Sequence, residues 1–452
     1  MTDPIAIVDL FSGPGGLGEG FSRVTDEQGQ RRFRIDVSIE CEPSAHRTLR
    51  LRAFLRRFTK VPEAYFEWIN TGGPQPDWSK LFPAEWQAAE DEARCMRLGE
   101  QVTTDFLLDR IGRLRTRVGH RSILIGGPPC QAYSLVGRAR NRGTITYSAE
   151  RDHRNFLYEE YVNILRALEP DVFVMENVKG MLSASVAGRR IFDNVRKDLG
   201  ACGYDLVAMA PRTPGQNLQS GGDFQPADFI IRAEEHGIPQ ARHRVIIVGL
   251  RKGAFSLENL PKLDFEQTAA TVRDVLGSLD ALRSGISRGD TTEDWVAAVL
   301  RACRDVRETT AEMVDHVGHQ FRERINLVED RIASVARRGR AGRVAAGISE
   351  DCPPALAAWL SAPAVSQLPN METRGHMPAD LGRYLFSSIF AAVRGYSPKA
   401  MDFPASLAPN HANWRSGKFS DRFRVQTWDA PSSTVTSHIS KDGHYFIHPD
   451  PT

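Results

Sequence analysis

A cysteine follows two glycines and two prolines at a point where the chain leaves an apolar run. The segment from Gly126 to Cys130 (GGPPC) comes directly after Ser122 to Ile125. In an open α/β sheet, ligands bind outside the carboxyl ends of the strands. Proline fixes its own φ and restricts the residue before it, so this turn holds the thiol in one place. The segment therefore predicts a nucleophilic thiol at a sheet edge, although a free cysteine is more often buried and inert.

A carboxyl group ends a second apolar run. Val172 to Met175 is followed by Glu176 and Asn177. If the two strands are neighbours, Cys130 and Glu176 face one crevice. An acid there can donate a proton to a ring nitrogen or bind it by a hydrogen bond. A carboxylate that caps the next helix is the alternative.

Arginines gather at two further places in the sequence, the loop after Cys130 and the stretch 242–244. The loop after Cys130 is rich in glycine and arginine, and cationic neighbours favour the thiolate and suit phosphates. Arg242 and Arg244 precede the apolar run 245–250, so their side chains should point to the same side and favour a planar or anionic ligand. A solvated loop and a salt-bridged edge strand are the respective alternatives. The arginine-rich run 337–343 could track phosphates or form a surface loop.

A glycine-rich turn near the N-terminus predicts a nucleoside site. Gly13 to Gly18 (GPGGLG) follows the apolar run 5–11 and precedes a short helical segment, so the backbone can approach a ligand closely. Glu40 ends the next predicted strand about 20 residues further on, where a carboxylate accepts hydrogen bonds from ribose hydroxyls. A tight structural turn with a surface glutamate is the alternative, and dehydrogenases share the glycine pattern.

Composition limits the class of protein. The 452 residues exceed one ordinary domain, and the net charge of +2 means that contacts with phosphates must come from local clusters. The six cysteines include no CxxC pair, which argues against a metal site of the zinc type and against a disulfide framework. With no visible signal peptide or long apolar span, we expect a cytoplasmic protein without membrane contact.

Alternating strands and helices must position these groups. We expect strands at 5–11, 34–40, 122–125, 171–175, 204–210 and 245–250, with helices at 43–58, 104–117, 155–168 and 189–200. This alternation predicts an α/β fold with a doubly wound, mostly parallel sheet. We expect three regions: a first domain at 1–251 with an insertion at about 60–100, a second domain at 252–420, and a returning segment at 421–452.

In order and in residue type, these motifs resemble the DNA (cytosine-5)-methyltransferase family of prokaryotic restriction-modification or phage-defence systems. The matching stretches are 9–16 (DLFSGPGG), 127–131 (GPPCQ), 175–178 (MENV), 240–244 (QARHR), and Arg424 with 431–435 (PSSTV). The resemblance covers residues 5–250 and roughly 421–449. It implies a Rossmann-like, S-adenosylmethionine-dependent methyltransferase domain, with 252–420 as a variable target-recognition domain.

The resemblance also implies a role for each matched residue. Cys130 would attack carbon 6 of a cytosine flipped out of double-stranded DNA, Glu176 would bind ring nitrogen 3, and Arg242 and Arg244 would hold the base or its loop. Methyl transfer would leave S-adenosylhomocysteine. Residues implied at the cofactor are Phe11, Ser12, Gly13, Gly15, Gly16, Glu40, Asp105, Pro129, Asn177 and Val178. Residues implied at DNA are Gln131, Ser134, Arg138, Arg140 and Gln240.

The sequence departs from the family pattern in two places. The insertion obscures the acid of the third motif, for which Asp105 is the candidate, and the family's last motif does not follow residue 449. We therefore expect weak cofactor binding by this chain alone, or a second polypeptide that supplies the missing motif. Two other functions stay open: an RNA cytosine-5 methyltransferase, and a DNA-binding subunit of a defence complex that has lost turnover. The length of 252–420 favours DNA.

Overall fold

The chain divides into two compact units. A computed structural model describes residues 3–129, 156–186, 189–209, 224–257, 260, 263–265, 269–311, 316–340, 342–410, 414, 422–436 and 443–451. Unit 1 comprises 1–63, 75–232 and 243–265, and unit 2 comprises 64–74, 233–242 and 266–452. In this division the segment 421–452 belongs to unit 2, together with 266–420. The sequence analysis instead predicted that this segment returns to the first domain. The functional boundaries at 251 and 420 stay predictions.

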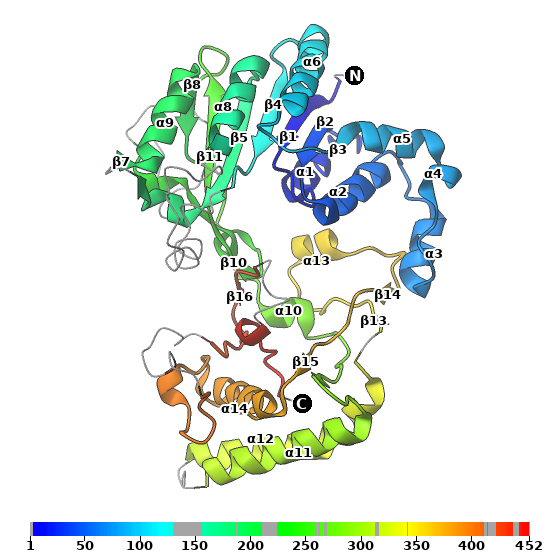
Figure 1. Cartoon of the computed structure of the whole chain (residues 1–452), viewed down its shortest axis with the longest axis vertical. Coiled ribbons are helices and arrows are strands. Elements are labelled where there is room, and N and C mark those ends of the chain that lie inside the picture. The colour runs from blue at the N-terminus through cyan, green and yellow to red at the C-terminus, as the bar shows by residue number, and fades with distance from the viewer. Residues whose placement is uncertain are drawn as a thin grey trace. The chain divides into compact units, whose positions relative to one another are not determined.

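Unit 1 is built on an eight-stranded sheet with the order β3-β2-β1-β4-β5-β11-β8, and β9 also pairs with β11. Figure 1 shows this order from β3 on the right to β8 on the left. The strands are β1 (Ile5–Leu10), β2 (Phe33–Glu40), β3 (Ala93–Cys95), β4 (Ser122–Gly126), β5 (Val172–Val178), β8 (Tyr204–Val207), β9 (Ile230–Arg232) and β11 (His243–Arg251). β1 to β5 run parallel, and β11 is antiparallel to its neighbours β5 and β8. The predicted α/β fold with a doubly wound, mostly parallel sheet is confirmed.

The apolar runs form the two covered faces of this sheet. Alternate residues of a strand point to opposite faces, so Ala6, Val8 and Leu10 join one buried cluster and Ile7 joins another. The helices of unit 1 are α1 (Gly16–Ser22), α2 (Pro43–Leu55), α4 (Trp78–Leu81), α5 (Pro83–Glu92), α6 (Gln101–Val118), α8 (Phe156–Leu168) and α9 (Ile191–Ala201). The two-stranded ribbon of β6 (Ser185–Val186) and β7 (Arg189–Arg190) precedes α9. Most predicted helices and strands lie within a few residues of these bounds.

The region at 60–100 is more regular than its sequence indicated. It contains α4, α5 and β3, and β3 extends the main sheet by pairing with β2. Phe54 of α2 packs against Trp78, Phe82 and Trp86 at ring-centroid distances of 5.3–6.0 Å. Aromatic packing thus fixes a segment that shows no helical period.

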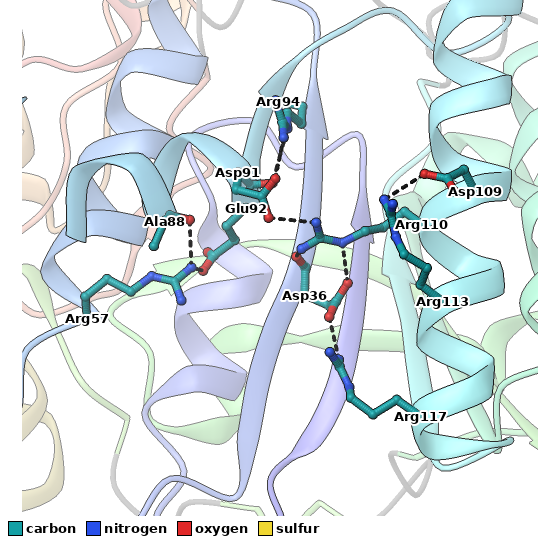
Figure 2. A network of polar contacts seen from close by, with 10 residues as sticks. All are labelled: Asp36, Arg57, Ala88, Asp91, Glu92, Arg94, Asp109, Arg110, Arg113 and Arg117. Atoms are coloured by element: carbon teal, nitrogen blue, oxygen red, sulfur yellow. Dashed lines mark hydrogen bonds and ion pairs between the residues drawn. The ribbon is translucent and has the colours of Figure 1, made fainter. Parts of the chain in front are cut away.

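Ion pairs centred on the buried Asp36 and on Arg110 bind this segment and α6 to the sheet. Figure 2 shows Arg110 of α6 between Asp36 of β2, at 2.8 Å, and Asp91 of α5, at 2.7 Å. Arg117 approaches the second oxygen of Asp36 at 2.7 Å. Because Asp36 is buried and Arg110 is largely covered, removing Arg110 would leave a poorly compensated charge at Asp36.

Unit 2 is mainly helical. Its helices are α3 (Glu63–Thr71, most of which belongs here), α10 (Val272–Leu276), α11 (Thr292–Thr309), α12 (His316–Arg338), α13 (Pro354–Leu360) and α14 (Pro378–Arg394). Short strands pair as β10 (Gln240–Ala241) with β16 (Ser432–Ser433), β12 (Gly285–Ile286) with β15 (Gly375–His376), and β13 (Val344–Ala345) with β14 (Gln367–Leu368). Buried residues of α11, α12 and α14, such as Phe321 and Phe386, form its core. Among the described residues, no helix is long and apolar enough to cross a membrane.

The arginine-rich run after α12 contacts protein groups. Arg338 pairs with Asp280 at 3.0 Å, and Arg340 pairs with the part-buried Asp290 at 2.7 Å. Arg343 donates to the carbonyl of Ile69. These contacts favour a structural role for the run over one in binding phosphates.

Candidate active site

The loop that leads to Cys130 packs directly against the end of β5. A Cβ atom at Gly127 would lie 2.9 Å from Glu176 Oε2, so only glycine fits here without a shift. The buried Asn177 donates from Nδ2 to the carbonyl of Pro128 at 3.2 Å. β4 and β5 are parallel neighbours, which brings their carboxyl ends to one edge. The two strands are therefore neighbours, which is the condition under which Cys130 and Glu176 were expected to face one crevice.

Glu176 is held from a second side by β11. Arg244 Nε lies 2.7 Å from Glu176 Oε1, and both side chains are largely covered, with 19% and 26% of their surface exposed. In the antiparallel register Arg244 faces Val178 and Ile246 faces Glu176, so the ion pair is diagonal. Oε1 is thus turned to Arg244 while Oε2 is turned to Gly127. The structure places the carboxylate between the cysteine loop and a guanidinium.

Arg242 and Arg244 belong to different units and have different hydrogen-bond partners. By contacts Arg242 belongs to unit 2, and its Nη1 donates to the carbonyl of Val435 at 3.5 Å. Gln240 is also in unit 2, where β10 pairs with β16 and Gln240 Oε1 accepts from Val435 N at 3.3 Å. The matching stretches 240–244 and 431–435 therefore pair with each other.

The glycine turn and Glu40 form one assembly at the ends of β1 and β2. Gly13 and Gly15 have φ of 56° and 90°, the left-handed region that favours glycine. Gly13 N donates to Glu40 Oε2 at 2.8 Å, and Glu42 N donates to Oε1 at 2.7 Å. Each carboxylate oxygen keeps a second lone pair, so Glu40 is oriented and can still accept a hydrogen bond. Gly16 begins α1.

Phe11 has an unusual backbone conformation. Its φ is 56°, which is uncommon for a bulky residue and costs roughly 1–3 kcal/mol. The next residue is tied down, because Ser12 N donates to Ile39 O at 3.1 Å and Ser12 Oγ donates to Asp9 O at 2.9 Å. Strain of this kind collects at ligand sites, and nothing in the sequence indicated it.

Asp9 is a buried acid that sequence reasoning missed. Its side chain is 1% exposed, and neither carboxylate oxygen has a hydrogen-bond partner among the described residues. Burial raises the pKa of Asp9 to about 7, and the negative charges of Glu92 and Glu40 add to the rise, whereas Ser12 and Arg56 oppose it. An aspartate in an otherwise apolar strand was the available signal.

A cavity of about 320 Å³ lies beside the assembly of Glu40 and the glycine turn. Residues of two strand ends and of the α6 segment line it: Cys41, Cys95, Met96, Arg97, Glu100, Val102 and Thr103. Glu40 and Cys95 are register partners across β2 and β3, and Met96 N donates to Glu40 O at 3.0 Å. Asp105 does not line this cavity. It is exposed on α6 and accepts from Gln101 Nε2 at 2.8 Å.

The remaining predicted residues fall in two groups. Pro129 is half-buried at the last described position before the cysteine, and Val178 is half-buried at the end of β5. The other predicted residues lie outside the described part of the chain, and they are Cys130, Gln131, Ser134, Arg138 and Arg140.

Comparison with known proteins gives consistent similarities. The sequence pattern of the family described as C-5 cytosine-specific DNA methylase matches residues 110–346. Type II methyltransferase M.Bpa9945I of Bacillus paralicheniformis is 27% identical over 468 aligned residues, which span 98% of this chain and 86% of that protein. Type II methyltransferase M.XorII of Xanthomonas oryzae pv. oryzae is 27% identical over 300 residues, or 66% of this chain and 51% of that protein.

A solved structure of the Entamoeba histolytica methyltransferase EhMeth superposes with a TM-score of 0.33 and 14% identity, over 60% of this chain and 59% of that one. A score this low carries no argument about function.

Proposed function

Because the chain belongs to the C-5 cytosine-specific DNA methylases, we propose that it transfers a methyl group from S-adenosylmethionine to carbon 5 of a flipped-out cytosine in double-stranded DNA. One observation carries this proposal. The segment that leads to Cys130 is packed against Glu176 by Gly127 and anchored to Asn177 through Pro128. A thiol carried on from this segment and the carboxylate of Glu176 can then act on the same base.

The residues around Glu40 fit the cofactor. Its carboxylate is oriented by two backbone N–H groups and can accept from the ribose, and the neighbouring cavity of about 320 Å³ can take the adenine. Phe11 would stack on that base, and the glycine turn would leave room for the methionine portion. At the end of β3 the cavity is lined by Cys95 and Met96. S-adenosylmethionine, when bound, supplies the methyl group as an electrophile.

The protein groups then act on the cytosine ring. Cys130 forms a bond to carbon 6, which makes carbon 5 electron-rich. Glu176, protonated at Oε2, donates a hydrogen bond or its proton to ring nitrogen 3, which stabilises the negative charge that develops there. Arg244 positions Glu176 through Oε1 and so fixes the direction of Oε2. After carbon 5 is alkylated and loses its proton, the bond between Cys130 and carbon 6 breaks and the thiolate is released. Because this chemistry needs both faces of the ring, the base must leave the duplex.

The proposed reaction requires the chain to bind double-stranded DNA. We propose that the arginine-rich loop after Cys130, with Gln131, Ser134, Arg138 and Arg140, contacts DNA phosphates, and that Gln240 and Arg242 contribute to binding the DNA and its target base. The function proposed for the cell is the modification step of a restriction-modification or related defence system, since curated relatives are type II methyltransferases.

A methylation assay tests this function. The full chain would be incubated with S-adenosylmethionine and either duplex DNA or transfer RNA, and 5-methylcytosine would be mapped by bisulfite sequencing. We expect methylation of DNA at a defined sequence, no signal from the Cys130→Ser variant, and normal signal from the matched control Cys202→Ser. Methylation of transfer RNA alone, or persistence of the DNA signal without Cys130, would contradict the proposal.

A further inference from the structure

Two cysteines stand side by side at the edge of the candidate cofactor site. Cys41 follows the last residue of β2, and Cys95 is the last residue of β3. Both are exposed, and both line the same cavity of about 320 Å³. The proposed reaction uses neither thiol, since its nucleophile is Cys130.

The strand register fixes how near the two residues are. Cys95 is the register partner of Glu40, which directly precedes Cys41. With a strand spacing of about 4.8 Å and a rise of about 3.3 Å per residue, the Cα atoms of Cys41 and Cys95 lie roughly 6 Å apart. Disulfides span Cα separations of about 4.4–6.8 Å. The Cα separation is therefore within the range of a disulfide. Side chains one position apart in a strand point to opposite faces, but Cys41 lies just past the end of β2, and both cysteines line the same cavity.

The two cysteines are also neighbours of Glu40, through the chain for Cys41 and through the strand pairing for Cys95. The next residue after Cys95 donates its N–H to the Glu40 carbonyl, and Glu40 also receives the N–H of Gly13. Burial and the charge of Glu40 raise the pKa of the Cys41 thiol. A change of covalent state at Cys41 thus acts next to the carboxylate proposed to bind ribose, inside the cavity proposed for adenine.

We propose that Cys41 and Cys95 form a reversible disulfide that closes the cavity beside Glu40 and blocks cofactor binding. The cross-link is a property of this chain's own residues, whereas its effect on the cofactor rests on the proposed function. The pair would make methylation depend on the thiol–disulfide balance of the surroundings.

The chemistry is an exchange with a low-molecular-weight disulfide such as oxidised glutathione. The thiolate of Cys95 attacks one glutathione sulfur, forms a mixed disulfide and releases one glutathione thiolate. The thiol of Cys41 loses its proton to solvent and attacks the Cys95 sulfur, and the second glutathione thiolate leaves. The two cysteines lose two electrons and oxidised glutathione gains them, so the exchange is balanced and a reducing thiol reverses it.

Peptide mass spectrometry and calorimetry test the proposal. The full chain would carry Cys130→Ser, so that this cysteine cannot react, and would be treated with oxidised glutathione. We expect a peptide in which Cys41 is joined to Cys95, and at least a tenfold loss of S-adenosylmethionine affinity by isothermal titration that dithiothreitol restores. Cys41→Ser and Cys95→Ser should each abolish the cross-link and keep their own reduced-state affinity after oxidation. Cys202→Ser should respond like its parent.

Three results would count against the inference. Stable glutathione adducts on either cysteine without a cross-link would show that the geometry is unsuitable. A cross-link that leaves affinity unchanged would refute the block on cofactor binding. Equal loss of affinity in Cys41→Ser would show that another thiol is responsible. The cross-link is read by mass alone, so a reduced chain that binds no S-adenosylmethionine would instead count against the proposed function.

Discussion

Gly127 and Glu176 lie so close that a Cβ atom at residue 127 would be 2.9 Å from Glu176 Oε2. Glycine at this point therefore sets the distance between the cysteine loop and the carboxylate. The preceding glycine is restricted in the same way, because a Cβ at Gly126 would lie 2.6 Å from the carbonyl oxygen of Leu10. Both glycines before the prolines are therefore required by close packing. The loop and the strand ends form one packed unit before any ligand binds.

Replacing this glycine should displace the carboxylate. We expect Gly127→Ala to lower methyl transfer by about tenfold or more, because a shift of about 1 Å in a positioned group can cost that much, and to destabilise the fold by about 1–3 kcal/mol. Single-turnover methylation and urea unfolding measure the two effects. Gly112→Ala is the matched control, since nothing lies within 4 Å of a Cβ at this helical position. It should stabilise the protein by about 0.5–1 kcal/mol.

The ion pair of Glu176 with Arg244 should matter for chemistry more than for cofactor binding. We expect Glu176→Gln to lower the rate of methyl transfer by about 100-fold or more, while S-adenosylmethionine affinity changes less than about threefold. Asp171→Asn is the control, because Asp171 pairs with Arg251 at 2.8 Å near the opposite end of β5 and β11. A similar loss of rate in that variant would mean that the ion pairs act only by stabilising the strands.

The two candidate acids for the cofactor can be separated by binding. Glu40→Ala should weaken S-adenosylmethionine binding by about tenfold or more, because it removes the acceptor and releases the N–H groups of Gly13 and Glu42. Asp105→Ala should have little effect, since that side chain is exposed and contacts Gln101. Titration calorimetry gives both values. The opposite ranking would restore Asp105 as the third-motif acid.

Asp9 should make stability depend on pH. Its pKa is about 7 in the folded protein and 3.8 in the reference state, so the folded protein keeps a proton that the unfolded chain loses. This stabilisation is complete below about pH 3.8 and is lost as the pH rises through about 7, for a total of about 4 kcal/mol.

Urea unfolding across this pH range checks the sign. Asp9→Asn cannot ionise, so its free energy of unfolding should rise relative to the parent between about pH 4 and pH 7 and stay level above that. The exposed Asp109, which pairs with Arg113, serves as the control, and Asp109→Asn should show no such trend. A parent and an Asp9→Asn variant with parallel pH profiles would show that Asp9 is ionised at neutral pH.

The parts of the fold that follow from local pattern could be predicted. Mainly apolar runs such as Ile5–Leu10 and Val172 to Met175 are long enough to mark buried strands, and the polar residues at their ends mark the site edge. β3 was missed because Ala93–Cys95 is three residues long and its position depends on pairing with β2. The helices around it depend on aromatic packing with Phe54, which leaves no period in the sequence.

The sequence allowed several residues of the candidate site to be chosen, but it did not indicate which of them contact one another. Glu176 and the glycine turn could be chosen from their places at strand ends. The pairing of Glu176 with Arg244 instead depends on an antiparallel register, and the strained φ of Phe11 depends on how β1 meets the loop. Cys41 and Cys95 are 54 positions apart in the sequence and meet only because β2 and β3 pair.

Covalent trapping tests the central claim most directly. Duplex DNA that carries 5-fluorocytosine at the target position cannot lose a proton from carbon 5, so the bond to the attacking sulfur should persist after methyl transfer. We expect a stable protein–DNA adduct that requires S-adenosylmethionine, maps to the peptide of Cys130 and is lost in Cys130→Ser. An adduct on another cysteine, or full methylation of ordinary DNA by Cys130→Ser, would contradict the assignment of this thiol and Glu176 to one cytosine.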